Sequence, residues 1–278
     1  MGRAENIAIF EDTERLVKTN DRLRSSVQQS TKNQKLILET DKLEKPDLER
    51  YPFEAEIIVS KKRAYEAAKA YKGMKTVVHN FASASNPGGG VVNGANAQEE
   101  CLCRCSGLYF NLNTQPMWDG FYRAHRAAQD PIHNDDIIFT PGVTVFKTDT
   151  ANPVLMEERD WYDVDVITCA APNLRPKPNN MQNRGGGKKR AVSEKELLAI
   201  HEKRLRRILD VAVMQEEEAV ILGAFGCGAF QNSPSVVARA AKAVLEEEYA
   251  HAFRVIEFAV YCPPLDDLNY RTFQRYFK

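Results

Sequence analysis

The sequence lacks the features that would assign it to a membrane or a nucleic-acid-binding class. Lys plus Arg and Asp plus Glu both total 38 among 278 residues, so neither sign of charge is in excess. No apolar run approaches the roughly 20 residues that a membrane-spanning helix needs. Because a balanced charge attracts neither nucleic acid nor a membrane over a distance, we expect no membrane association and no sequence-specific binding of nucleic acid. An anionic ligand would need a local set of donors.

Cysteine is scarce as well. Six cysteines are too few for a disulfide scaffold in a chain of this length. The first residues, Met-Gly-Arg-Ala-Glu-Asn, match neither a signal peptide nor a myristoylation site. These observations predict reduced thiols and an intracellular protein, in the cytoplasm or also in the nucleus.

Composition and periodicity suggest two parts. Residues 1–50 are polar and predict a mainly helical N-terminal extension that packs on the rest. In residues 51–278 strands alternate with helices, which favours an α/β domain with a mixed or mainly parallel sheet covered on both faces. Residues 173–190 carry prolines, three glycines and the run Lys188-Lys189-Arg190, and are typical of a flexible surface insertion.

The pattern predicts individual elements by their residue ranges. Helices are expected at 7–17, 62–71, 98–108, 193–215, 234–249 and 268–277. Strands are expected at 34–40, 56–60, 76–81, 136–140, 143–146, 164–170, 219–224 and 255–261.

One strand–loop–helix junction combines glycines with carboxylates. Gly88-Gly89-Gly90 lets backbone N–H groups approach a ligand closely, and the helix expected to begin near Gln98 adds unpaired N–H groups. Such a place favours phosphate or a developing negative charge. Glu99 and Glu100 lie in the same region. A plainer interpretation is that both glutamates only complement the helix dipole.

A second junction follows the strand expected at 219–224. A glycine-rich loop from Gly223 leads to Ser233-Pro234, which suits a helix start. In α/β sheets ligands bind where loops leave the carboxyl ends of strands, so two such loops could wrap a diphosphate. Neither loop matches a Walker motif or a dinucleotide fingerprint, and a structural role for each is the alternative.

Together the two loops resemble a known family. Gly88-Gly89-Gly90, followed after seven residues by Gln98-Glu99-Glu100, is similar to the signature of poly(ADP-ribose) glycohydrolases. The wider segment 80–104 resembles the microbial-type members, which have a macrodomain core, and residues 223–232 resemble their diphosphate loop. The resemblance implies a macrodomain with a mixed central sheet flanked by helices.

The resemblance also implies an activity and roles for residues. The expected reaction is exo-type hydrolysis of the ribose–ribose bond, in which Glu100 is the acid/base and Glu99 binds ribose hydroxyls. The expected ligand-binding residues are Asn86, Gly88, Gly89, Gly90, Gln98, Gly226, Cys227, Gly228, Ala229, Phe230 and Tyr261. The expected partners are ADP-ribose, poly(ADP-ribose) and ADP-ribosylated proteins, with no cofactor, no metal and a monomeric chain.

Several alternatives stay open. The chain could be an ADP-ribose reader with little turnover, or a hydrolase of mono-ADP-ribosyl groups. A third option is a thiol enzyme that uses Cys227, whose place before a helix could lower its pKa. Tyr261 suits adenine stacking or the core equally. We interpret His79 as a packed core residue, and Cys101, Cys103 and Cys105 as inert thiols because their spacing does not suit a zinc site.

Overall fold

A seven-stranded mixed sheet forms the centre of the molecule. The structure is a computed structural model that describes residues 2–180, 184–263 and 265–278. The strands are β1 (Lys35–Ile37), β2 (Glu56–Ser60), β3 (Thr76–Phe81), β4 (Ile137–Val145), β5 (Tyr162–Cys169), β6 (Ala219–Leu222) and β7 (Val255–Ala259). Their order is β1-β4-β5-β3-β6-β7-β2, in which β4 is antiparallel to β1 and β5 and the other neighbouring pairs are parallel.

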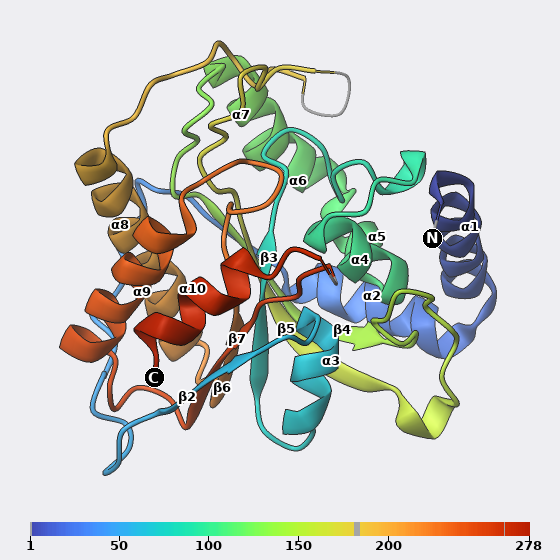
Figure 1. Ribbon diagram of the computed structural model, residues 1–278. Helices are drawn as coiled ribbons and strands as arrows, with labels where there is room; N and C mark the ends of the chain where they lie inside the picture. Colours follow the sequence, from blue (N-terminus) through green and yellow to red (C-terminus); the bar gives the residue numbers. More distant parts are fainter. Residues whose placement is uncertain (1, 181–183, 264) are drawn as a thin grey trace.

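Helices cover both faces of this sheet (Figure 1). The first group consists of α1 (Arg3–Thr19), α2 (Asp21–Asn33), α3 (Ala64–Ala68), α4 (Gln98–Cys105), α5 (Leu108–Leu112), α6 (Gln115–Met117) and α7 (Arg123–Ala128). Short 3₁₀ helices are η1 (Lys69–Tyr71), η2 (Val91–Asn93) and η4 (Glu158–Asp160), and η3 (Trp118–Tyr122) is a π-helix. The second group, on the other face, consists of α8 (Glu194–Met214), α9 (Pro234–Glu248) and α10 (Leu268–Tyr276). Within the described residues, no helix is long and apolar enough to cross a membrane.

Alternating apolar residues on the strands explain the two layers. In β3, Val77 packs into the core beneath α8 and α9, whereas its neighbour Val78 packs into the core beneath α3 and α4. The same alternation places Phe139 of β4 in the first core and Ile138 in the second. Since successive side chains of a strand point to opposite faces, apolar residues at consecutive positions require a helical layer on each side.

The expected α/β architecture, a mixed sheet flanked by helices with helices at the N-terminus, is confirmed. The prediction of two strands at 136–140 and 143–146 is wrong, because both belong to β4, whose register shifts between Thr140 and Val143. The helix expected at 98–108 ends at Cys105. The pattern did not predict α2 or the helices between 108 and 128. The division at residue 50 stays a prediction, and 181–183 of the expected insertion lie outside the described residues.

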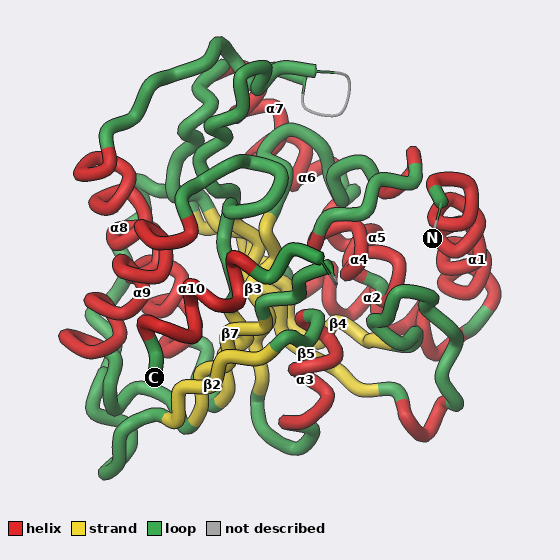
Figure 2. Tube along the Cα trace, in the orientation of Figure 1, coloured by secondary structure: helices red, strands yellow, loops and turns green. Residues whose placement is uncertain are grey.

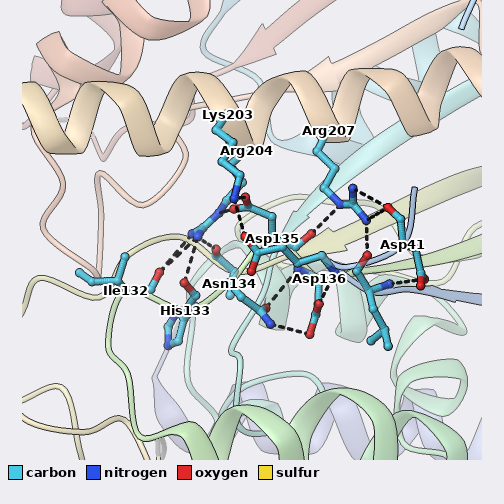
Figure 3. A network of polar contacts seen from close by, with 12 residues as sticks. Asp41, Ile132, His133, Asn134, Asp135, Asp136, Lys203, Arg204 and Arg207 are labelled. Carbon is cyan, nitrogen blue, oxygen red and sulfur yellow. Dashed lines mark hydrogen bonds and ion pairs between the residues drawn. The ribbon is translucent and has the colours of Figure 1, made fainter. Parts of the chain in front are cut away.

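Long loops gather at the carboxyl edge of the parallel strands, the upper edge in Figure 2. One loop, residues 130–136, is attached to α8 by a buried arginine (Figure 3). The Arg204 Nε atom donates to Asp135 Oδ1 at 2.7 Å, and Nη1 donates to the Ala170 carbonyl at 2.6 Å. Its guanidinium also reaches the carbonyls of Ile132 and His133 at 3.3 Å. The arginine therefore joins the end of β5 to the loop before β4.

The carboxylate in this network keeps its charge despite burial. Burial by itself would raise the pKa of Asp135, but Arg204 and Lys203 outweigh it and lower the pKa below its ordinary value. Since this lowered pKa stabilises the folded state only while the group is ionised, that contribution is lost as the pH falls through the pKa of the folded state.

We predict that Arg204→Met destabilises the protein strongly. The change removes the buried donor of Asp135 Oδ1 and of several carbonyl groups and leaves only Lys203 paired with Asp135, which costs on the order of 3–5 kcal/mol. The matched control is Arg206→Met on the same helix, since Arg206 is one-third exposed and pairs with Glu248 at the surface. Its cost should stay below about 1 kcal/mol. Urea denaturation compares the two, and equal losses would contradict the assignment.

Candidate active site

Glu99 and Glu100 lie in the first turn of α4, beside the end of β3. Both are buried, with exposed fractions of 3% and 7%. The chain leaves β3 at Phe81, passes through the glycine loop and returns to start α4 at Gln98. The loop and the first turn of the helix therefore enclose two adjacent carboxyl groups at the carboxyl edge of the sheet.

Backbone amides hold Glu100 in place. Its Oε1 atom accepts a hydrogen bond from the Gly90 amide at 2.9 Å, and Oε2 accepts one from the Ala97 amide at 2.9 Å. Gly89 has a φ of +58°, and a Cβ at this position would lie 2.5 Å from Glu100 Oε1 and 3.1 Å from Glu99 Oε2. The missing side chain at residue 89 is therefore what lets the loop close over both carboxyl groups.

Glu99 is held by the end of β3 and the residues just after it. Its Oε2 atom accepts from the Ser83 amide at 2.8 Å, and Oε1 accepts from Asn80 Nδ2 at 3.3 Å. Burial and then the neighbouring charge of Glu100 raise the pKa of Glu99 well above its ordinary value, although the hydrogen bonds oppose this. Two carboxyl groups this close cannot both be charged at low cost, so the pair retains a proton more readily than isolated glutamates do.

Gln98 supports the loop through the strand. The Phe81 amide donates to its Oε1 atom at 2.9 Å, and its Nε2 atom donates to the His79 carbonyl at 2.8 Å. The last residue pair between β3 and β6 is Val78 with Ile221. The Gln98 amide therefore continues the β3 hydrogen-bond ladder where β6 has ended, and it fixes the start of α4 against the sheet.

Helix α1 fastens the far side of the same loop. Arg3 Nε donates to the Asn93 carbonyl at 2.6 Å, and Asn6 Nδ2 donates to the Gly94 carbonyl at 3.1 Å. A Cβ at Gly94 would lie 2.3 Å from the Arg3 carbonyl oxygen, so the contact needs glycine. Arg104, on α4, donates to the Ala95 carbonyl at 2.7 Å. The segment between the glycines and α4 is thus held from two sides.

The second glycine-rich loop presents unused donors. Within the part of the chain that the structure describes, the amides of Gly226, Gly228, Ala229 and Phe230 donate no hydrogen bond. This loop is shaped from beneath by Asn232, whose Nδ2 atom donates to the carbonyls of Pro172 at 2.7 Å and Gly226 at 3.1 Å. Four such amides before the 15-residue helix α9 make a setting that favours an anion.

His201 orients Asn232. Its Nε2 atom lies 2.9 Å from Asn232 Oδ1, which fits a neutral ring that donates its proton. Burial is the main cause that lowers the pKa of His201 to about 4, so the ring is neutral at physiological pH. The support of the loop should therefore be independent of pH above that value.

Two aromatic residues expected to bind the ligand lie at this edge. Phe230 is half-buried, with the Arg175 guanidinium 5.3 Å from its ring centre and the His133 ring 6.1 Å away. Tyr261 is 47% exposed and lies under the Arg63 guanidinium at 3.9 Å, so the interpretation as a core residue is wrong. Asn86 Oδ1 accepts from Arg126 at 2.5 Å, next to the glycine loop.

The remaining candidates, four cysteines and His79, are buried or half-buried. Burial raises the pKa of Cys227, so the expectation of a lowered pKa at this helix start is wrong. Cys101, Cys103 and Cys105 are buried, and burial raises the pKa of each. His79 packs 4.4 Å from the Phe225 ring, and burial lowers its pKa to about 3, as expected for a core histidine.

Three supporting residues escaped the sequence analysis. Asn80 and Ser83 hold Glu99, and Arg104 holds the loop before α4. Asn80 could have been found from the sequence, because an asparagine in an apolar strand is expected to be buried and then needs polar partners. Nothing in the spacing marks Arg104, whose guanidinium donates to the Ala95 carbonyl and to the side chains of Asn96 and Cys101.

Comparison with known proteins identifies the family. The family model described as the microbial-type PARG catalytic domain matches residues 4–148, just over half of the chain. The chain belongs to this family. A search of curated protein sequences gave no significant match.

Solved structures of this family cover nearly the whole chain. Poly(ADP-ribose) glycohydrolase from Thermomonospora curvata is 29% identical, with a TM-score of 0.81 over 98% of this chain and 99% of that one. A mutant of the same enzyme is 30% identical over 98% of this chain and 99% of that one, with a TM-score of 0.78. The enzyme from Deinococcus radiodurans, in complex with ADP-ribose, is 29% identical over 90% and 96% of the two chains, with a TM-score of 0.74.

We predict that Gly89→Ala destabilises this family member and disturbs both carboxyl groups. A left-handed backbone costs a non-glycine residue about 1–2 kcal/mol, and the contacts with Glu99 and Glu100 add to that cost. The control is Gly228→Ala, because a Cβ there meets nothing within 4 Å. Its effect should stay within about 0.5 kcal/mol. Thermal and urea unfolding measure both, and an unaffected Gly89 variant would show that the loop does not close as described.

Proposed function

We propose that the chain hydrolyses the ribose–ribose O-glycosidic bond of poly(ADP-ribose) and releases ADP-ribose from the ends of the polymer. The observation that carries the proposal is the buried pair Glu99 and Glu100, enclosed by the glycine loop in a member of the microbial-type glycohydrolase family. The proposed substrate extends to polymer attached to proteins.

The chemistry requires a proton donor and a base. Cleavage of a glycosidic bond passes through an oxocarbenium-like state, the leaving oxygen needs a proton, and water must then be activated. In the proposed mechanism Glu100 gives its proton to the leaving ribose oxygen and then takes one from the attacking water. Glu99 binds hydroxyls of the ribose. Burial and then the charge of Glu100 raise the pKa of Glu99, so the coupled pair holds a proton more readily than isolated glutamates do.

The other expected residues complete the proposed ligand site. The loop at Gly226, Cys227, Gly228 and Ala229 would lie against the diphosphate, with the free amides of Gly226, Gly228 and Ala229 as donors, and Phe230 would pack on the distal ribose. The glycine loop, with Asn86 and Gly88 to Gly90, would line the opposite side, and Tyr261 would stack on adenine in place of its contact with Arg63. Gln98 acts through the β3 backbone in this proposal, since both ends of its side chain are occupied there.

We predict that Glu100→Gln slows turnover by at least about a hundredfold, because general acid–base catalysis contributes about 10²–10⁴. The measurement is release of free ADP-ribose from poly-ADP-ribosylated protein. The glutamine amide will face a backbone N–H, so ADP-ribose affinity and thermal stability must be measured as folding controls. Glu99→Gln should weaken binding as well as turnover.

Other outcomes would change either the residue roles or the proposed function. If Glu99→Gln abolishes turnover and Glu100→Gln does not, the two roles are reversed. Wild-type protein that binds ADP-ribose but releases none from polymer or modified protein is a reader. Release only from mono-ADP-ribosylated protein would assign the chain to that reaction.

We also predict that Cys227→Ala keeps most of the activity, with a loss below about tenfold. The thiol is protonated at neutral pH, because burial raises its pKa, and a protonated thiol is a poor nucleophile. The same release assay tests this, with mass spectrometry of trapped intermediates as a second measurement. Complete loss of turnover in a folded variant would favour the thiol enzyme.

A further inference from the structure

Residues 173–190 concentrate positive charge in a chain that is neutral overall. The segment contains Arg175, Lys177, Arg184, Lys188, Lys189 and Arg190 and has no Asp or Glu, whereas the two signs are equal in the whole chain. The sequence pattern alone predicts only a flexible surface insertion for this segment. The structure shows where this charge lies relative to the active site.

The segment is attached next to both loops of the site. At one end, the Leu174 amide donates to the Phe230 carbonyl at 2.9 Å, directly beside the proposed diphosphate loop. At the other end, a Cβ on Gly187 would lie 1.9 Å from the Gln129 carbonyl, and a Cβ on Gly185 would lie 2.7 Å from Arg126 Cα. The described parts of the segment therefore lie against the end of α7, as Figure 1 also shows.

Helix α7 contributes a further cation. The Arg126 guanidinium donates to the Ser85 carbonyl at 2.7 Å and to Asn86 Oδ1 at 2.5 Å, and it lies 4.7 Å from the Trp118 ring centre. These partners are neutral, and among the described residues no carboxylate pairs with Arg126. It is thus a half-buried positive charge in contact with the catalytic loop.

We call Arg126, Arg175, Lys177, Arg184, Lys188 and Lys189 the basic rim. None of these six forms an ion pair with a carboxylate of the described residues, in contrast to Arg190 and Arg123, which pair with Asp130, Glu196 and Asp119. Burial lowers the pKa of Arg175, and burial followed by the charges of Arg184 and Arg123 lowers the pKa of Arg126. Unpaired cations held near one another are costly unless an anion joins them.

The chemistry of the substrate matches this surface. Each unit of poly(ADP-ribose) carries a diphosphate, so the polymer behind the cleaved bond is a flexible polyanion. Neutralising its phosphates with Lys and Arg releases counterions and strengthens binding without base readout. The rim borders both loops of the site, so a polymer leaving the carboxyl pair meets positive charge at once.

We propose that the basic rim is a second binding surface, which holds the diphosphates of the ADP-ribose units that precede the one being released. The inference rests on the proposed function and adds a preference for long chains over short ones. The terminal unit occupies the two glycine-rich loops, and the rim acts only on the polymer that continues from it.

The test reverses charge at the exposed end of the rim. Lys188→Glu/Lys189→Glu should raise Kd for labelled poly(ADP-ribose) about tenfold and reduce the dependence of log Kd on log salt by about one to two. Kd for free ADP-ribose should stay the same. The control, Lys69→Glu/Lys72→Glu, makes the same charge change on exposed lysines before β3, at the opposite edge of the sheet, and should alter neither value.

Binding is measured in the Glu100→Gln background as well as in wild type, so the result does not depend on turnover. If the glycohydrolase proposal fails, the Kd values for poly(ADP-ribose) and for free ADP-ribose still test whether the basic rim binds polymer. An equal effect of both double variants on polymer affinity would overturn the rim. Weakened binding of free ADP-ribose would overturn it too, by showing that these lysines act on the terminal site.

A DNA single strand of equal charge serves as the competitor. If it displaces the polymer equally well, the surface binds any polyanion and the proposal is wrong. Lys188→Arg/Lys189→Arg should restore polymer affinity to the wild-type value, since either cation neutralises phosphate.

Discussion

Two carboxyl groups lie almost without solvent at the start of α4, and the donors around them determine how the rest of this edge is built. Burial opposes their charge, and the amides of Gly90, Ala97 and Ser83 compensate for part of that cost. This compensation works only if the loop stays within hydrogen-bond distance. The left-handed turn at residue 89, the Gln98 bridge to β3 and the contact with α1 all serve to keep it there.

The second loop depends on a different kind of support. Its shape comes from Asn232 beneath it, oriented by the neutral ring of His201. Arg204 joins the end of β5 to the loop before β4 from the same helix, α8. Polar groups in the interior therefore shape this loop from below, while its upper surface keeps free amides. A buried network of this kind is costly when a single member is removed, which ties the stability of the protein to the form of its site.

Most of the sheet and both glycine-rich loops could be predicted from the sequence, because their signals are local. Alternating apolar residues fix the strands, and glycines followed by Gln98, Glu99 and Glu100 mark a loop that leads into a helix. Prediction failed where the structure depends on residues that are distant in the sequence. A bulge inside β4 looked like a turn. The exposure of Tyr261 could not be predicted, because it depends on which distant residues lie against the end of its strand. Arg104 and Arg204 each donate to backbone carbonyls as well as to side chains, and a carbonyl partner leaves no trace in sequence spacing.

The contact between α1 and the glycine loop also governs how the protein can be handled. Arg3 lies on Asn93, so whatever part of a chain precedes it, natural or added, emerges beside the glycine loop. The last helix, α10, ends on the face covered by α8 and α9, well away from α1 in Figure 1. A purification tag, fluorophore or surface tether belongs at that end, where it leaves the approach to the carboxyl groups open.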